Sequence, residues 1–334
     1  MQILVVTHSR DPIDRTLDAI RRRLAAAGHP HGLIRLDTDR LASDHGFSMV
    51  QEAGATTIHV RLPTGLVPIT SLRAVWLRRF GTLTLPDGLP DHIAVGIHQE
   101  SRSALLGWLT ALPAPTMDPR ALRRDAERKA FTLRVAAEEG FVVPRTMHTT
   151  RLVAAKAFVA SCAEGAITKV LTSFAVDREG QEHVVMTNPI TEADLDRMGD
   201  LRWCPITLQE RIWKQRELRV TIVGPRVLAC EADTAAIAGA EVDFRRAGRQ
   251  VAPHWRPAEL PAEVNDRLHR VMARMGLNYG AADLLVDREG RYVLLEVNAA
   301  GEYLLYDHVW DGAISEAIAA HLVEQTGWRE PVVE

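Results

Sequence analysis

The part of the 334-residue sequence most informative about the fold is a pair of apolar runs around a charged turn, Ala282-Asp283-Leu284-Leu285-Val286-Asp287-Arg288-Glu289-Gly290-Arg291-Tyr292-Val293-Leu294-Leu295-Glu296-Val297-Asn298. Apolar runs on both sides of a glycine-containing turn predict a β-hairpin. If Glu289-Gly290 forms a two-residue turn, Arg288 pairs with Arg291. Asp283 then lies directly opposite Glu296.

Asp283, Glu296 and Asn298 form a candidate metal site on this hairpin. Glu296 and Asn298 are two residues apart, so they share one face of their strand. Two carboxylates among apolar neighbours need a cation. Mg²⁺ commonly takes one or two carboxylates together with waters and substrate phosphates. The sequence therefore favours a magnesium site, and a hairpin whose polar ends reach solvent remains the alternative, because acidic turns of this spacing are common.

A second segment, Gln209-Glu210-Arg211-Ile212-Trp213-Lys214-Gln215-Arg216-Glu217-Leu218-Arg219-Val220, places Glu210 and Glu217 at the ends of neighbouring predicted strands. Backbone groups at a strand edge can pair with an adenine ring, and a carboxylate can accept hydrogen bonds from ribose hydroxyls. An exposed strand of alternating polarity also accounts for the pattern. The segment alone does not decide between a nucleotide site and an exposed strand.

The chain is predicted to begin with a parallel α/β domain. Ile3–Val6 and Gly32–Leu36 read as strands, and a helix with one apolar stripe begins near Pro12 between them, which makes a βαβ unit. Leu112–Pro115 reads as a linker. Strands outnumber helices after residue 165, which indicates an α+β region. We expect three parts: an α/β domain over 1–115, a central part over 116–205 and a C-terminal part over 206–334.

Within the α+β region we expect two further local features. Ile167–Leu171 and His183–Thr187 read as a pair of strands. A capping pattern then opens at Thr191, with Asp194 three residues later, and predicts a short helix over 191–201.

Composition excludes several classes of protein. Apolar residues make up 46% and charged residues 25% of the chain, with a formal net charge of −3. Such a chain has no overall positive field for nucleic acid. The three cysteines are far apart in sequence and predict neither a disulfide framework nor a zinc site. We find no signal peptide and no apolar run long enough for a membrane span. We therefore expect a cytoplasmic protein without nucleic-acid or membrane partners.

Lysine is scarce in this chain. Only Lys129, Lys156, Lys169 and Lys214 are lysines among the 40 basic residues. An arginine-rich codon usage explains the scarcity as a whole. Because an ammonium group is a compact point charge and a guanidinium is a planar fork, the lysines that remain are candidates for positions where the chemistry needs them.

Five elements in order resemble the ATP-grasp superfamily of ligases: a helix lysine (Lys129), a strand lysine (Lys169), a Gln-Glu-x-Ile hinge (Gln209 to Ile212), a further glutamate (Glu217), and the Asp283…Glu296-x-Asn298 set. The set covers about residues 116–300, and the α/β start resembles the usual pre-grasp domain. The resemblance implies an α/β N-terminal pre-grasp domain followed by an α+β ATP-grasp fold.

The resemblance also implies an ATP site. Lys129 and Lys169 would contact the phosphates, as suits lysine as a point charge. Many members of the superfamily cover the phosphates with a glycine-rich loop after the second lysine. Here Lys169 is followed by Val-Leu-Thr-Ser-Phe-Ala. We expect hydroxyl groups such as that of Ser173 to take the place of the glycine loop.

By the same resemblance, the hinge would hold the nucleoside. Gln209, Glu210 and Ile212 would present the hinge to adenine, and Glu217 would hold the ribose.

The resemblance also implies bound magnesium and positively charged side chains in this site. Asp283, Glu296 and Asn298 would carry two Mg²⁺ ions that bridge the phosphates. Arg219 would stabilise an acyl-phosphate and its transition-state charge. Some dipeptide-forming members have an arginine two residues before the metal aspartate, where this chain has Ala281. We expect Arg219 and Arg246 to supply this charge instead.

Within the superfamily, the chain resembles the graspetide maturases (microviridin-type macrocyclases) in four stretches: Val75–Arg79, Met186–Leu195, Pro205–Gly224 and Leu295–Tyr303. That resemblance implies a ligase that uses ATP, yielding ADP and phosphate. It would activate Asp or Glu side chains of a ribosomal precursor peptide, with its leader and core, and form macrocyclic ω-esters or ω-amides. It also allows a homodimer.

Leader recognition needs a surface outside the ATP set. We expect a groove between the helix over 191–198 and the strand over 183–187, where Asp194 and Asp196 would pair with basic leader residues. A solvated helix face is the alternative explanation of these two carboxylates.

Two other functions remain open from the sequence. One is an amino-acid ligase that acts on a protein tail or on a small molecule, because ribosomal-protein-modifying glutamate ligases share much of the pattern. The other is a nucleotide-binding regulator without turnover. The presence of Lys129, Lys169 and the Asp283…Asn298 set argues against a regulator.

Overall fold

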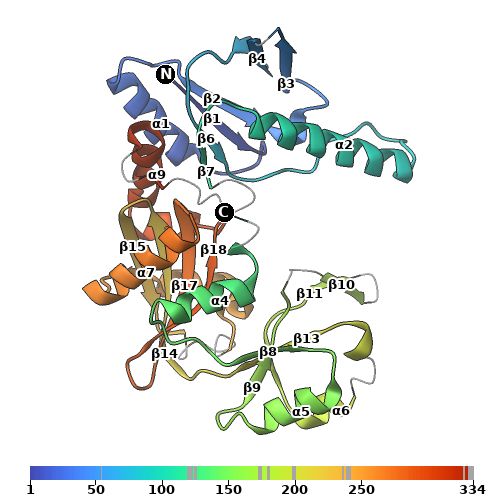
Figure 1. The fold of residues 1–334 in the computed structure, drawn as a ribbon, viewed down its shortest axis with the longest axis vertical. Helices are drawn as coiled ribbons and strands as arrows, with labels where there is room; N and C mark the ends of the chain where they lie inside the picture. Colours follow the sequence, from blue (N-terminus) through green and yellow to red (C-terminus); the bar gives the residue numbers. More distant parts are fainter. Residues whose placement is uncertain are drawn as a thin grey trace.

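The computed structural model describes residues 1–53, 55–118, 123, 126–171, 175–178, 181–197, 201–234, 237, 242–325 and 328–329. Figure 1 shows three parts in a row: the N-terminal domain, a C-terminal part in the middle, and a central part at the far end. The order along the chain therefore differs from the order in space. None of the described helices is long and apolar enough to cross a membrane.

The N-terminal domain contains the predicted parallel sheet. Its strands lie in the order β2-β1-β6-β7, with β1 Gln2–Thr7, β2 Leu33–Asp37, β6 Leu72–Leu77 and β7 Thr116–Met117. Helix α1 (Asp14–Ala26) connects β1 to β2 and buries its predicted apolar stripe. A small antiparallel sheet, β3 (Gly46–Glu52), β4 (Ala55–Leu62) and β5 (Gly65–Pro68), and helix α2 (Asp91–Thr110) complete the domain. The sheet extends past the boundary expected at residue 115, because β7 pairs with β6.

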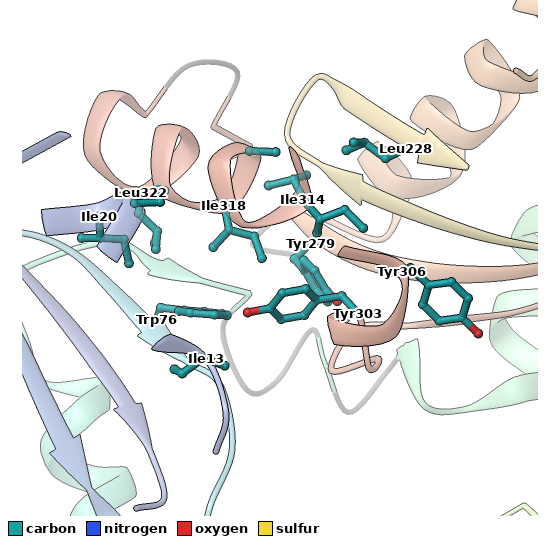
Figure 2. Close-up of a cluster of buried hydrophobic side chains, with 14 of the residues drawn as sticks. Ile13, Ile20, Trp76, Leu228, Tyr279, Tyr303, Tyr306, Ile314, Ile318 and Leu322 are labelled. Carbon is teal, nitrogen blue, oxygen red and sulfur yellow. The ribbon is translucent and has the colours of Figure 1, made fainter. Parts of the chain in front are cut away.

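The last helix of the chain packs against this first domain. Helix α9 (Ala313–Glu324) lies beside α1, and both contribute to one buried core. Figure 2 shows Ile20 and Trp76 of the N-terminal domain in one cluster with Leu322 and Tyr303 of the C-terminal part. The N-terminal domain and the C-terminal part therefore share a continuous apolar core.

The central part is a four-stranded sheet in the order β12-β9-β13-β8, with β8 Thr146–Thr149, β9 Ala166–Thr168, β12 Asn188–Ile190 and β13 Ile206–Glu210. Helices α5 (Leu152–Ala160) and α6 (Glu192–Asp196) pack together on it, and β10 (Ala175–Arg178) pairs with β11 (Gln181–Val184) in a separate hairpin. Helix α6 begins with the predicted capping box of Thr191 and Asp194.

Two expectations about the central part are corrected. The pairing of 167–171 with 183–187 was wrong, because β9 pairs with β12 and β13 while β11 pairs with β10. Strand β13 belongs to the central sheet, through β8 and β9. The chain therefore changes sheet at the three-residue hinge Arg211–Trp213, and not at residue 205.

The C-terminal part is a five-stranded antiparallel sheet in the order β16-β15-β14-β17-β18, with β14 Lys214–Val223, β15 Arg226–Ala232, β16 Arg256–Ala258, β17 Tyr279–Asp287 and β18 Tyr292–Asn298. One face packs on α4 (Lys129–Glu138) and α7 (Ala262–Arg274), and the other packs on α8 (Leu304–Val309) and α9. Every residue of β17 is buried except Asp283, which is half-buried.

The hairpin of β17 and β18 places Asp283 opposite Glu296, as predicted, but through a different turn. Val286 pairs with Tyr292, and the N–H of Asp287 donates to Arg291 O at 3.1 Å, so the loop is 288–290 and ends at Gly290 with φ +80°. The Asp287 carboxylate accepts hydrogen bonds from the backbone N–H groups of residues 289 and 291, at 2.9 Å each, and stabilises this longer turn. A bulge at Leu295 restores the register that the two-residue turn predicted.

Asp118 joins the N-terminal domain to the C-terminal sheet. It is 2% exposed, directly follows β7, and has a left-handed φ of +56°. Its carboxylate accepts the N–H of Asn278 at 2.6 Å and that of Tyr279 at 2.9 Å. These donors would have no partner without it, since they lie at the start of β17.

We predict that Asp118→Ala lowers the free energy of unfolding by about 2–4 kcal/mol, because two buried N–H groups lose their acceptor. Asp118→Asn is the matched control, since asparagine retains an acceptor oxygen and tolerates a left-handed backbone. Denaturant unfolding followed by circular dichroism measures both variants. Equal stability of the alanine and asparagine variants would contradict the assignment.

Candidate active site

The candidate site is a cavity of about 610 Å³ between the central and C-terminal parts. It brings together the following residues predicted from the sequence: Lys129, Lys169, Gln209, Glu210, Ile212, Glu217, Arg219, Asp283, Glu296 and Asn298. They come from α4, from the end of β9, from the β13 hinge and from three adjacent strands of the C-terminal sheet. Residues separated by more than 160 positions in sequence thus line one space. Ser173 lies outside the described residues.

The predicted metal residues lie at the open end of the hairpin. Asp283 is the cross-strand neighbour of both Glu296 and Arg219, and Asn298 pairs with Ala281 one step further along the sheet. The side chains of Asp283 and Glu296 are 22% and 29% exposed, so both are partly open to the cavity.

Each carboxylate has a basic partner. Arg219 Nη1 donates to Asp283 Oδ1 at 2.8 Å, and Lys129 Nζ lies 2.9 Å from Glu296 Oε2. Burial raises the pKa of Asp283 to about 6, against the opposing charge of Arg219 and with support from the charge of Glu296. Burial also acts to raise the pKa of Glu296, but the charges of Lys129 and Lys169 hold it below the ordinary value. Their surroundings therefore shift the pKa values of the two carboxyl groups in opposite directions.

This donor set fits magnesium held together with phosphate. Two carboxylates and an amide oxygen supply hard ligands, but too few to complete an octahedral shell without waters or substrate oxygens. Across the part of the chain that the structure describes, no three His, Cys, Asp or Glu side chains gather in a metal cluster. The site therefore suits a cation that arrives with a phosphate ligand.

The hinge end of the cavity is rigidly held. Gln209 is 2% exposed and donates from Nε2 to Thr146 Oγ1 at 2.9 Å. Two guanidinium groups lie over the Trp213 ring, that of Arg211 at 3.8 Å and that of Arg288 at 4.8 Å from its centroid. These cation–π contacts brace the hinge against the β17–β18 turn.

Glu217, the predicted ribose ligand, is held in place by two neighbours. Its Oε2 atom accepts from Lys214 Nζ at 2.8 Å and from Thr234 Oγ1 at 2.7 Å. Lys214 and Thr234 therefore orient the Glu217 carboxylate. Lys156, by contrast, pairs with Asp196 on the surface of the central part, away from the cavity lining.

Three predicted residues are absent from the described lining of this cavity. Arg246 Nη2 instead donates to Thr187 O at 2.8 Å and to Asn188 Oδ1 at 2.6 Å. Asp194 caps its own helix through Thr191 and pairs with Arg197, while Asp196 pairs with Lys156. Figure 1 draws α6 beside α5 and apart from the hairpin of β10 and β11.

Sequence reasoning assigned no role to a loop that closes one end of the cavity. Glu302 lines the cavity, and Arg219 Nη2 donates to its carbonyl oxygen at 3.0 Å. Burial acts to raise the pKa of the Glu302 carboxyl, but the Arg78 charge and other donors hold it below its ordinary value. Tyr306 also lines the cavity and packs under Arg219 at 5.7 Å. The signal for this loop was the matching stretch 295–303.

Comparisons with known proteins agree with this geometry. The family described as "MvdD pre-ATP grasp domain" matches residues 2–124. A comparison with curated proteins found no match. A RiPP-associated ATP-grasp ligase from Chryseobacterium gregarium, in complex with ADP and a leader and core peptide, is 28% identical, with a TM-score of 0.92 over 100% of both chains.

Two solved structures from Microcystis aeruginosa MRC are also similar. Macrocyclase MdnC, bound with precursor peptide MdnA, is 30% identical with a TM-score of 0.84, over 97% of this chain and 100% of that chain. Macrocyclase MdnB is 26% identical with a TM-score of 0.77, over 97% of this chain and 99% of that chain.

Gly301 gives a test of this geometry. A Cβ at this position would lie 2.7 Å from Arg219 Nη2 and would also overlap Ala281. We predict that Gly301→Ala lowers the free energy of unfolding by about 1–3 kcal/mol, because the tight contact must open. Denaturant unfolding measures the loss.

Gly107→Ala is the matched control, because a Cβ there meets nothing within 4 Å and the position lies inside helix α2. This variant should be as stable as the parent or more stable by about 0.5–1 kcal/mol. Equal effects of the two substitutions would refute the packing argument for Gly301.

Proposed function

Because the chain belongs to the family of RiPP ATP-grasp ligases and microviridin-type macrocyclases, we propose that it closes rings in a ribosomal precursor peptide. It is an ATP-grasp ligase whose substrates would be ATP, with Mg²⁺, and a precursor peptide. The specific proposal is that Asp or Glu side chains of the core peptide become acyl-phosphates and react with core hydroxyl or amine groups. The products are macrocyclic ω-esters or ω-amides.

The observation that carries this proposal is the opposed pair Asp283 and Glu296 at a cavity that also collects Lys129, Lys169 and Arg219. Two adjacent carboxylates suit a divalent cation, and three cationic side chains around them suit a polyanion. ATP with magnesium satisfies both requirements. Relatives of this fold contain ADP with leader and core peptide, or a precursor peptide, which supports the same substrate classes.

The side chains have separable roles in the proposed reaction. Lys129 and Lys169 would hold the phosphates, while the hinge at Gln209, Glu210 and Ile212 would hold adenine and Glu217 the ribose. Asp283, Glu296 and Asn298 would hold the magnesium, which we propose to be two ions. Magnesium supplies charge neutralisation at the transferred phosphoryl group.

The proposed reaction has two steps, activation of a substrate carboxylate and then ring closure. A carboxylate oxygen of the peptide forms a bond to the γ-phosphorus of ATP, and the bond to the β-γ bridging oxygen breaks to release ADP. A hydroxyl or amine then bonds to the acyl carbon, phosphate leaves, and the nucleophile loses its proton. Arg219 would stabilise the charge that develops on the acyl-phosphate. The cavity thus acts by positioning and charge.

Co-expression with a candidate precursor peptide tests the function. Such a peptide would be encoded beside the gene and would contain repeated Thr or Ser and Asp or Glu. We predict that mass spectrometry detects the loss of one water for each ring with the native chain, and no loss with Glu296→Gln or Asp283→Asn. Both variants should stay folded, because each replaces a carboxylate by an amide of the same shape.

Two results would contradict the proposed function or the proposed metal site. A mass increase by amino-acid units on a protein tail would favour an amino-acid ligase. Normal ring formation and ADP release by Glu296→Gln and Asp283→Asn would refute the metal assignment.

The lysines give a second prediction. Lys169→Arg should lower ATP turnover by about tenfold or more, since a planar fork cannot replace a point charge that fits between phosphates. Lys156→Arg is the matched control, because an exposed ion pair with Asp196 contributes only about 0–1 kcal/mol and arginine can retain it. Steady-state ADP release measures both. Equal rates for the two variants would argue against a phosphate role for Lys169.

The leader-binding surface remains a proposal centred on Asp194 and Asp196. Their present partners, Arg197 and Lys156, are exchangeable surface cations. Asp194→Ala combined with Asp196→Ala should weaken binding of a synthetic leader peptide by about fivefold, equivalent to roughly 1 kcal/mol. Fluorescence anisotropy measures the affinity. An unchanged affinity would remove this surface from consideration, and Glu192→Ala on the same helix is the control.

A further inference from the structure

One segment of the N-terminal domain reaches the active-site cavity only indirectly. Strand β6 ends at Leu77, and Arg78 continues it, with its N–H donating to Val6 O at 2.9 Å. The Arg78 side chain is 3% exposed although it carries a charge. A charge buried to this degree must be matched by other groups. The carboxylates that match it are Asp11 of the same domain and Glu302 of the C-terminal part.

Arg78 crosses the domain boundary and holds the loop that follows β18. Its Nη2 atom lies 3.2 Å from both carboxylate oxygens of Glu302, and its Nη1 atom lies 3.4 Å from Ala300 O. The guanidinium also lies 5.1 Å from the ring centroid of Tyr303, and Asp11 lies 3.8 Å from its Nε atom. A planar fork is needed to meet both Glu302 oxygens and the carbonyl together.

The loop held by Arg78 is the same loop that orients two of the proposed active-site residues. Asn298 Oδ1 accepts the N–H of Ala300 at 2.9 Å, which fixes the side-chain amide. Arg219 donates to Glu302 O at 3.0 Å and to Asp283 at 2.8 Å. Gly301 fits against Arg219 without room for a Cβ. A displacement of residues 300–302 would therefore move Asn298 and Arg219.

We propose that Arg78 is a positioning residue for the magnesium end of the cavity, acting from the N-terminal domain through Glu302 and Ala300. This inference rests on the proposed function, because it concerns the same metal site. Arg78 is absent from the described cavity lining, so it acts through the loop and not on the substrate. The stretch Val75–Arg79, which the function had left without a role, is thereby connected to the chemistry.

The test compares ADP affinity with and without Mg²⁺ by isothermal titration calorimetry on the full chain. Arg78→Lys keeps the charge and loses the fork. It should reduce the magnesium-dependent gain in ADP affinity by about tenfold, as is typical for outer partners of metal ligands. ADP affinity in EDTA should stay within about twofold, because the hinge binds the adenosine independently of this loop.

Arg23→Lys is the matched control. Arg23 also joins the N-terminal domain to the C-terminal part, through ion pairs of α1 with Glu316 and Glu324 on α9, but it does not contact residues 298–303. This variant should keep the full magnesium-dependent gain. A role limited to domain docking would affect Arg23→Lys and Arg78→Lys alike.

Three results would overturn the proposal. These are an unchanged magnesium-dependent gain in Arg78→Lys, an equal loss of ADP affinity with and without Mg²⁺, and an equal loss in Arg23→Lys. If Arg78→Lys does not fold, Glu302→Gln is measured in its place, and an unchanged gain there overturns the proposal equally. A native chain that binds ADP with Mg²⁺ but forms no rings contradicts the proposed function and leaves this inference intact.

Discussion

The feature on which the rest of the site depends is the opposition of two carboxylates on the β17–β18 hairpin, whose other residues are mainly apolar. Asp283 and Glu296 face each other across β17 and β18, and Asp283 is the one residue of β17 that is not fully buried. Like charges in this position repel, so the arrangement persists only with positive charge beside it. Arg219 and Lys129 supply that charge within the chain. Because an apolar pair would satisfy the sheet equally well, the carboxylates indicate a site for a cation that arrives with its own ligands.

The basic side chains lie near these two carboxylates only because three segments of the chain, far apart in sequence, meet there. Lys129 comes from the first turn of α4, Arg219 from the adjacent strand β14, and Lys169 from the end of a strand in the central part. The N-terminal domain contributes through a shared apolar core and through Arg78, which grips the loop after Asn298. The domain that contains no predicted ATP residue therefore still determines where two of them lie.

Much of the fold was predictable where a local pattern has one solution. The apolar stripe after Pro12 predicts α1, and the capping box at Thr191 predicts the start of α6; both are confirmed. The pairing of Asp283 with Glu296 was also confirmed, although the turn is one residue longer and a bulge compensates for it. The short strands of the central part could not be paired correctly, because three-residue segments such as β9 and β12 carry too little pattern to specify a partner.

The sequence by itself determined the kinds of groups in the site and their order along the chain. These groups are two carboxylates on paired strands, an amide two residues after the second carboxylate, a hinge segment, and lysines retained among many arginines. These features are local, because side-chain alternation and residue chemistry do not depend on distant neighbours. Only the tertiary structure decided which charges neutralise which. In the folded chain Lys129 forms an ion pair with Glu296, and Arg246 donates a hydrogen bond to the backbone oxygen of Thr187. Arg78 pairs with Glu302, which is 224 positions away in the sequence. Such contacts form between segments far apart in the chain, so their partners depend on how the sheets pack and not on any local pattern.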